Sequence, residues 1–204
     1  EVAHYNPLEV AKTNIDGAAN TIEAAQDAGV ARVVTLSSDK AYQPISAYGY
    51  SKAMAEALFL ASNWTVGEYG PIFAAVRYGN IWNSNGSVVP TWRRMIAEGR
   101  TIVPVTDPEA TRFFMRIEEA VALVINTAET MLGGELVIPE TLPAYRLGDL
   151  AEAMGVEMQI IGLPQHEKRH EGMREGLTSD KARRMSVEEL RTILGESPSH
   201  ADIP

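Results

Sequence analysis

Apolar residues recur at helical spacing near the start of the chain, and the pattern then changes to a short continuous run. Asn6 can cap a helix whose first position is Pro7, and apolar side chains follow every three or four residues until Gly29. The run ARVVTLSS at 31–38 is rich in β-branched residues, which is typical of a strand buried in a parallel sheet. We therefore predict a helix over about 7–28 that leads into a buried strand.

The same alternation is repeated further along the chain. A second helix is predicted over about 45–62, and the run PIFAAVRYGN at 71–80 is predicted to form the next strand. The buried side of this second helix is expected to carry Ala47, Ala53, Ala55, Leu58 and Leu60. The order helix, strand, helix, strand implies an α/β fold whose parallel strands are joined by helical crossovers.

Beyond Asn80 the hydrophobic pattern loosens, and shorter elements are expected. Helices are predicted over 90–99, 117–132, 146–155 and 186–194, and strands over 101–105, 134–139 and 156–162. Ser186 and Glu189 have capping-box spacing at the start of the last helix. The closing stretch GESPSHADIP is expected to fray.

The composition narrows the classes of protein. The 204 residues include 27 Asp and Glu against 18 Lys and Arg, and the net charge of −9 argues against a nucleic-acid partner. The absence of cysteine excludes disulfides and thiolate chemistry. With no apolar run near membrane-spanning length and no leader-like start, we expect a soluble, cytoplasmic protein with no membrane partner. Asn63 begins a glycosylation triplet that we interpret as chance.

Tyr48 and Lys52 are the first candidates for chemistry. They stand one helical turn apart, so their side chains share a face, and an ammonium group beside a phenol is expected to lower the phenol's pKa. The spacing alone also occurs by chance in ordinary helices. Its position adds weight, because the helix follows a strand that ends in Ser37-Ser38-Asp39-Lys40, and parallel sheets bind ligands beyond the carboxyl ends of their strands.

Several motifs together resemble one known family. NIDG, VVTLSSDKA, YGYSK and VRYGN resemble an extended short-chain dehydrogenase/reductase, and the match is closest to UDP-N-acetylglucosamine 4,6-dehydratases of the 5-inverting, polysaccharide-biosynthesis type. GSVVPTWRRMIAEG, VTDPEATRFF, GGELVIP and EKRHE follow in the family's order, so the resemblance covers roughly residues 5–173. It implies a partial Rossmann-like NAD(P)-binding half in residues 1–80. A small C-terminal α/β lobe that binds the nucleotide-sugar is implied in 81–204.

The resemblance also implies roles for individual residues. Tyr48 would be the base at the sugar C4 hydroxyl, and Lys52 would hold the ribose of NADP (or NAD) and lower the pKa of Tyr48. Asp39 would protonate the departing C6 hydroxyl, and Lys40 would be the base at C5. Since a simple epimerase or reductase needs no second acid/base pair, Asp39 and Lys40 favour dehydration. Tyr48 itself favours the 5-inverting branch, because related dehydratases carry methionine there. The remaining implied contacts are Ser37 and Tyr78 with the cofactor, and Ser38, Asn80, Ser87 and Arg112 with the nucleotide-sugar.

Simpler interpretations exist for some of these residues. Asn80 follows a strand, where asparagine is often only a turn former, and Arg112 and Arg116 could form surface ion pairs. Within NIDG, Gly17 is expected to allow close packing and Asn14 to be structural. His170 and Glu171 match a family motif, but the four histidines form no metal pattern, so no metal is expected.

The chain departs from the family pattern in two ways. No G-x-G-x-x-G or G-x-x-G-x-x-G turn is present, so we expect weak or no autonomous cofactor binding and an unpaired sheet edge. Where the family reads G-[I/L]-R-P-G-E-K, residues 162–168 read GLPQHEK, which puts the hold on diphosphate in doubt. His166 could restore some positive charge there.

Three interpretations therefore stand. The first is a large portion of a nucleotide-sugar 4,6-dehydratase, inactive or nearly so as this chain alone. The second is a truncated, non-catalytic homologue that acts as a binding module. The third is an epimerase or reductase of the same superfamily. A homo-oligomer is compatible with all three.

Overall fold

The computed structural model describes residues 5–67 and 69–196, and the chain forms two compact units. Unit 1 comprises residues 1–78, 118–140 and 172–175, and unit 2 comprises the remainder. The predicted boundary at residue 80 lies close to the first crossing, after residue 78. Within residues 81–204 the chain returns twice to unit 1, once as a helix and a short strand in 118–140 and once as a short strand in 172–175.

A parallel sheet forms the centre of unit 1. β1 (Arg32–Ser38) pairs in parallel with β2 (Ile72–Tyr78), and β2 pairs in parallel with the short β5 (Leu136–Val137). Both predicted strands are confirmed. In the sheet order β1-β2-β5, β1 is at an edge within the described part of the chain, and Leu36 on it is 46% exposed. The expected unpaired edge is therefore present.

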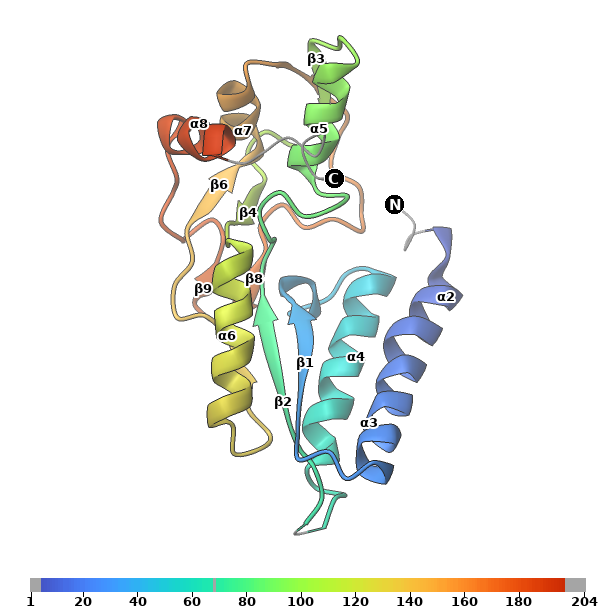
Figure 1. Ribbon diagram of the computed structural model, residues 1–204. Coiled ribbons are helices and arrows are strands. Elements are labelled where there is room, and N and C mark those ends of the chain that lie inside the picture. Colours follow the sequence, from blue (N-terminus) through green and yellow to red (C-terminus); the bar gives the residue numbers. More distant parts are fainter. Residues whose placement is uncertain (1–4, 68, 197–204) are drawn as a thin grey trace. The chain divides into compact units, whose positions relative to one another are not determined.

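Helices cover both sides of these strands, as Figure 1 shows. On one side lie α2 (Pro7–Ala11), α3 (Gly17–Asp27) and α4 (Ala47–Ser62), and on the other lies α6 (Ile117–Thr130). The predicted first helix is interrupted by a π-helical turn, η1 (Lys12–Asp16). Packing between the helices and the sheet buries an apolar core made of Ala18, Ile22, Ala25, Ala55, Phe59 and Phe73.

The buried side of α4 differs from the prediction. Ala55 is buried as expected, but Ala47 is exposed and the other predicted residues are half-buried. The reason is that the first turns of α4 pack on a polar turn and an ion pair rather than on aliphatic side chains. The fully buried positions are Gly49, Ser51, Ala55, Glu56 and Phe59.

Asn63 ends α4 and joins it to the sheet. Its amide nitrogen donates to the carbonyls of Leu60 and Phe73, at 3.0 and 2.9 Å, and its oxygen accepts from the Phe73 amide at 2.9 Å. Both polar groups of the side chain are therefore occupied by backbone. This supports the interpretation of the glycosylation triplet as chance.

Unit 2 contains two small sheets around its own core. Its longer elements are α5 (Val88–Ala97), β3 (Ile102–Val105), β4 (Thr111–Phe113), β6 (Ala144–Arg146), α7 (Leu147–Met154), β7 (Glu157–Ile160) and α8 (Val187–Glu196). β3 pairs in parallel with β7, and β4 pairs antiparallel with β6. The core contains Val89, Trp92, Val103, Val105, Phe114, Tyr145, Leu150, Met185 and Leu190.

The predicted helices and strands of unit 2 are confirmed in type, and some short strands were missed. Ser186 and Glu189 form the expected capping box, since each backbone amide donates to the other residue's side chain, at 2.7 and 3.1 Å. β4, β6, β8 (Gly172–Arg174) and β9 (Leu177–Thr178) were not predicted. Most of the tail predicted to fray lies outside the described residues. Among the helices that are described, none is long and apolar enough to cross a membrane.

Candidate active site

The end of β1 turns into η2 (Asp39–Ala41), a short 3₁₀ turn that carries the predicted acid/base pair. The Ser38 hydroxyl caps the turn by accepting from the Lys40 amide at 3.2 Å, and it donates to Asp39 Oδ1 at 2.9 Å. Lys40 Nζ donates to the same oxygen at 3.1 Å. Asp39 is only 1% exposed, so the structure buries a carboxylate and neutralises it with its neighbour in the sequence.

Tyr48 and Lys52 lie on α4, as predicted, and both are partly buried. The pKa of Tyr48 is raised by burial, while the nearby charge of Lys40 lowers it and that of Asp39 raises it. The first turn of α4, which carries Tyr48, packs directly against η2, which carries Asp39 and Lys40. The structure thus brings these predicted catalytic residues together within unit 1.

The predicted effect of Lys52 on Tyr48 is corrected by the structure. The pKa of Tyr48 is raised rather than lowered, because loss of hydration is the largest effect and the acting cation is Lys40. Lys52 Nζ instead donates to the Leu36 carbonyl at 2.6 Å. Burial lowers the pKa of Lys52, and the charge of Glu56 opposes this.

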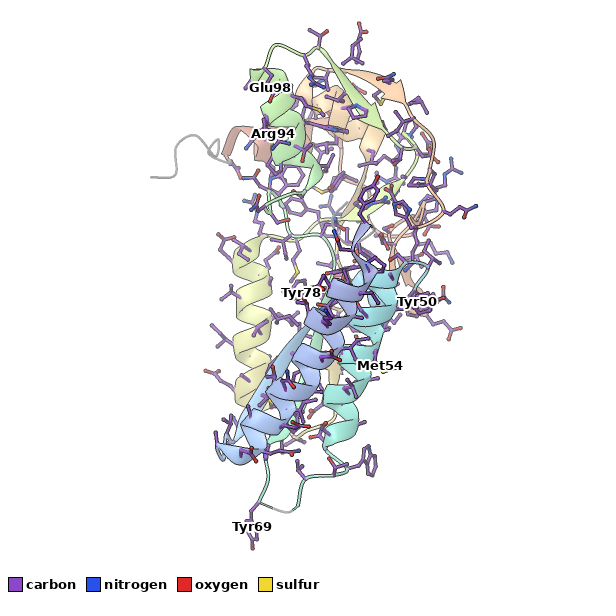
Figure 2. All side chains as sticks on the ribbon, turned by 90° about the vertical axis from the view of Figure 1, so that its right-hand side faces the viewer. Tyr50, Met54, Tyr69, Tyr78, Arg94 and Glu98 are labelled. Atoms are coloured by element: carbon purple, nitrogen blue, oxygen red, sulfur yellow. The ribbon has the colours of Figure 1, made fainter. Side chains whose placement is uncertain are left out.

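Ser37 and Tyr78, predicted to contact the cofactor, lie at the same end of the parallel sheet. Tyr78, labelled in Figure 2, is the last residue of β2 and pairs in register with Ser38. Burial raises the pKa of Tyr78, and the charge of Tyr48 adds to this. The buried Ser37 hydroxyl has no hydrogen-bond partner among the described residues. A buried hydroxyl of this kind needs a ligand group or a water molecule.

Asn14 supports α4 from the π-helical turn. Its amide donates to the Ser51 hydroxyl at 2.9 Å, and that hydroxyl donates to the Tyr48 carbonyl at 2.8 Å. These bonds agree with a structural role. π turns of this type occur often at functional sites.

Close packing was expected at Gly17, but the structure shows it at Gly49 instead. A Cβ atom at Gly17 would meet only the Lys12 carbonyl, at 3.8 Å, which is ordinary contact. A Cβ at Gly49 would lie 2.6 Å from the Lys40 carbonyl, because the first turn of α4 packs directly against η2. Sequence reasoning missed Gly49, although a glycine inside a helical segment was a signal.

A second group of predicted residues lies around a pocket in unit 2. Asn80 and Arg112 line this pocket, which has a volume of about 190 Å³. Oδ1 of Asn80 and the hydroxyl of Ser87 are buried, and the described residues provide no hydrogen-bond partner for either. The remaining lining residues are Val88, Trp92, Pro104, Val105, Thr106, Tyr145, Leu147 and Glu167. A pocket that combines apolar walls with a small number of polar groups is typical of small-molecule sites.

Arg112 is a buried residue of this pocket, so the surface ion-pair interpretation is wrong for it. It is 7% exposed, and its guanidinium donates to the carbonyls of Thr111 and Arg169, at 2.8 and 3.1 Å, and to the carboxylate of Glu167. Arg116 does form a surface pair, with Glu196 at 2.9 Å. Glu167 belongs to the altered GLPQHEK stretch, which therefore folds next to Arg112.

His170 and Glu171 have local partners in unit 2. His170 Nδ1 lies 2.8 Å from the Thr111 hydroxyl, and Glu171 is buried and pairs with Lys168 at 3.7 Å. The residues that the structure describes contain no cluster of three or more His, Cys, Asp or Glu side chains that could hold a metal ion.

Comparisons with known proteins agree with this architecture. A family model described as "Polysaccharide biosynthesis protein" matches residues 1–193. The inverting UDP-N-acetylglucosamine 4,6-dehydratase of Campylobacter jejuni subsp. jejuni serotype O:2 is 42% identical over 174 residues, which are 84% of this chain and 52% of that protein. The chain therefore spans about half the length of this curated relative.

Two solved structures show the same fold. Pen from Bacillus thuringiensis is 31% identical with a TM-score of 0.88, over 96% of this chain and 71% of that one. A dTDP-glucose 4,6-dehydratase from Streptomyces venezuelae, solved with NAD bound, is 18% identical with a TM-score of 0.73, over 91% and 65% of the two chains. The second likeness supports the fold alone.

Proposed function

The chain belongs to the polysaccharide biosynthesis protein family, and we propose that it carries the acid/base and sugar-binding part of a nucleotide-sugar 4,6-dehydratase. We further propose UDP-N-acetylglucosamine as the substrate, as named for the Campylobacter jejuni relative. The observation that carries the proposal is the Asp39–Lys40 ion pair beside Tyr48. A second acid/base pair is needed for loss of water but not for plain epimerisation or reduction.

The residues of unit 1 fit the nicotinamide side of a dinucleotide. Near the carboxyl ends of β1 and β2 lie the four predicted cofactor contacts, Ser37, Tyr48, Lys52 and Tyr78. The Ser37 hydroxyl is buried and has no hydrogen-bond partner in the described part of the chain. When bound, NADP or NAD would accept a hydride from sugar C4 and return it at C6. Tyr48 would take the proton of the C4 hydroxyl, and Ser38 would bind its oxygen. The glycine-rich turn for the pyrophosphate is not in this sequence.

The Asp39–Lys40 pair can perform both proton transfers of the dehydration. Dehydration breaks the C5–H and C6–O bonds, and one proton leaves C5 while one joins the departing hydroxyl. At 3.1 Å, Lys40 Nζ and Asp39 Oδ1 can exchange a proton directly. After that exchange Asp39 is a neutral acid for the C6 hydroxyl and Lys40 a neutral base for C5. The pair therefore supplies acid and base together without changing its net charge.

The pocket of unit 2 fits a part of the nucleotide. Arg112 offers a guanidinium to the diphosphate, and Asn80 offers a buried oxygen that lacks a partner among the described residues. Ser87, which precedes the lining residue Val88, has a buried hydroxyl that likewise lacks a partner in the described part of the chain. The volume of about 190 Å³ is below the 300–1,000 Å³ usual for a complete small-molecule site, so the pocket suits one portion of the ligand.

A second candidate function, a binding module without turnover, is favoured by the ion pair of Arg112. Because Glu167 already engages this guanidinium, an anionic ligand must displace a carboxylate. Together with the absent glycine-rich turn, this predicts that the chain alone binds cofactor weakly and turns over little or no substrate.

A chimera tests the proposal. This chain would replace the 174 matched residues of the Campylobacter jejuni dehydratase, and the product of UDP-N-acetylglucosamine with NADP⁺ would be identified by mass. We expect the 4-keto-6-deoxy product from the chimera, and loss of that product in its Asp39→Asn and Tyr48→Phe variants. A folded chimera that yields only a C4 epimer, or whose Asp39→Asn variant still dehydrates, would contradict the proposal. Turnover by the unfused chain would contradict the expected inactivity.

A further inference from the structure

A buried ion pair joins α4 to β2 within unit 1. Glu56 and Arg77 are each 7% exposed. Arg77 Nε donates to Glu56 Oε2 at 3.0 Å, and Nη2 donates to the other carboxylate oxygen, so the contact is bidentate. Removing both charges from water is costly, and such pairs often add little net stability. Their geometry can instead fix one arrangement of the segments that they join.

Arg77 also contacts two further segments. Its Nη1 donates to the carbonyl of Met173 on β8, 96 residues away in the sequence. Its guanidinium lies 5.9 Å from the centre of the Tyr42 ring, close enough for a cation–π contact. β8 packs against η2, and the Tyr42 amide donates to the Asp39 carbonyl at 3.2 Å, which closes that turn. One side chain therefore touches α4, β8 and the residue that ends η2.

The same pair is next to the other candidate residues. Glu56 follows Lys52 by one helical turn, and the charge of Glu56 opposes the effect of burial on the pKa of Lys52. Arg77 precedes Tyr78 on β2. The guanidinium of Arg77 thus lies between α4, which carries Tyr48 and Lys52, and η2, which carries Asp39 and Lys40.

We propose that Glu56 and Arg77 are positioning residues that hold the Asp39–Lys40 turn in a fixed place relative to the Tyr48–Lys52 helix. Arg77 acts through Tyr42 and through the Met173 carbonyl, and Glu56 sets the direction of the guanidinium. The positioning role rests on the proposed dehydratase function, whereas the coupling between Arg77 and η2 can be measured without it.

Amide hydrogen exchange in the intact chain tests the coupling. Arg77→Lys keeps the positive charge opposite Glu56 but loses the fork and the stacking surface for Tyr42. We expect exchange of the Tyr42 amide, which closes η2, to accelerate by about tenfold or more. Exchange of the Ile72 amide, which donates to the Ala31 carbonyl at 3.0 Å, should change by less than about twofold.

Arg32 provides a matched control. It is also a strand arginine of unit 1 that donates to distant carbonyls, those of Ala128 and Glu129, at 3.0 and 2.9 Å. Arg32→Lys should leave Tyr42 exchange unchanged. If Arg77→Lys accelerates all amides of unit 1 equally, or leaves Tyr42 unaffected, the proposal is wrong and the ion pair is merely structural.

Glu56→Gln supplies a second variant that keeps the shape of the side chain. It should accelerate Tyr42 exchange less than Arg77→Lys does, because the amide oxygen can still accept from Arg77. If Glu56→Gln accelerates exchange of the Tyr42 amide as much as Arg77→Lys or more, the coupling does not run through the bidentate guanidinium of Arg77.

Activity of the chimera separates the two proposals. In an active chimera, Arg77→Lys should lower kcat more than it raises KM for the nucleotide-sugar, since the substrate pocket lies in unit 2. If the chimera is inactive and Arg77→Lys selectively accelerates exchange of the Tyr42 amide, the proposed dehydratase function is rejected and the coupling through Arg77 is retained. If the chimera is active and exchange of the Tyr42 amide is not accelerated, the dehydratase function is retained and the coupling is rejected.

Discussion

Gly49→Ala is expected to destabilise unit 1 although alanine is the better helix former. The added Cβ would lie 2.6 Å from the Lys40 carbonyl, 3.1 Å from Pro44 Cβ and 3.3 Å from the Ser46 hydroxyl. Ordinary contact begins near 3.4 Å, so the helix and the turn must separate by roughly 0.8 Å at the closest point. The nearest atom is a backbone oxygen, which cannot move away as a flexible side chain would.

The magnitude follows from two opposing effects. Forced overpacking costs about 1–3 kcal/mol, whereas replacing glycine by alanine within a helix contributes about 0.5–1 kcal/mol of stability. The expected net loss for Gly49→Ala is therefore about 1 kcal/mol in the free energy of unfolding, within a range of about 0–2.5 kcal/mol. Urea unfolding followed by circular dichroism measures it, and a shifted midpoint at constant slope identifies a change in stability.

Gly17→Ala is the control with the opposite sign. Gly17 has helical angles, φ −61° and ψ −37°, and a Cβ there would meet only an atom at 3.8 Å. The substitution should stabilise the chain by about 0.4–1 kcal/mol. If Gly49→Ala is as stabilising as Gly17→Ala, the close approach of α4 to η2 is wrong and so is the inferred contact.

Two further predictions concern ionisation and ligand binding. Tyr48→Phe should remove from the tyrosinate absorbance titration one group whose pKa lies above the ordinary value of about 10. Because the folded pKa is raised, Tyr48 contributes stability that is present below pH ~10 and is lost as pH rises through its folded pKa. Phenylalanine does not ionise, so the Tyr48→Phe variant should unfold less readily than wild type in that pH range. An alkaline unfolding transition that is unchanged in Tyr48→Phe would contradict the burial of the phenol. Glu167→Gln should bind UDP about tenfold more tightly in calorimetry, since a carboxylate no longer competes for Arg112, and Arg112→Met should abolish the gain; weaker binding in Glu167→Gln would contradict a diphosphate site at Arg112.

Local periodicity was sufficient to predict the main elements of unit 1. β1 and β2 were predicted because each is a short apolar run with β-branched residues, and α4 because its apolar positions recur at helical spacing. The end of α4 and the capping box at Ser186 also depend on neighbours in the sequence. β4 and β6 were missed because strands of three residues are too short to show a period.

Features that depend on distant contacts could not be predicted. Residues 172–175 return to unit 1, where the Met173 carbonyl accepts a hydrogen bond from Arg77, and no local pattern indicates this contact. The resemblance supplied Asp39, Lys40, Tyr48 and Lys52, yet the direction of the Tyr48 pKa was wrong. That direction depends on how much water the fold removes from the hydroxyl, and spacing along a helix contains no information on burial.

The electrostatics of Tyr48 separate the two chemical stages proposed for this site. Lys40 lowers the pKa of Tyr48 and Asp39 raises it, so the two charges of the ion pair have opposite effects on the same hydroxyl. When a proton passes from Lys40 to Asp39, both charges disappear together and the two effects are removed in parallel. Because the effect of Lys40 is the larger of the two, the neutral form of the pair removes a net lowering, and Tyr48 should be the weaker acid in that form. The ion-paired form therefore favours the ionised Tyr48 that the proposed oxidation at C4 uses, and the neutral form favours a protonated Tyr48 during the proposed loss of water.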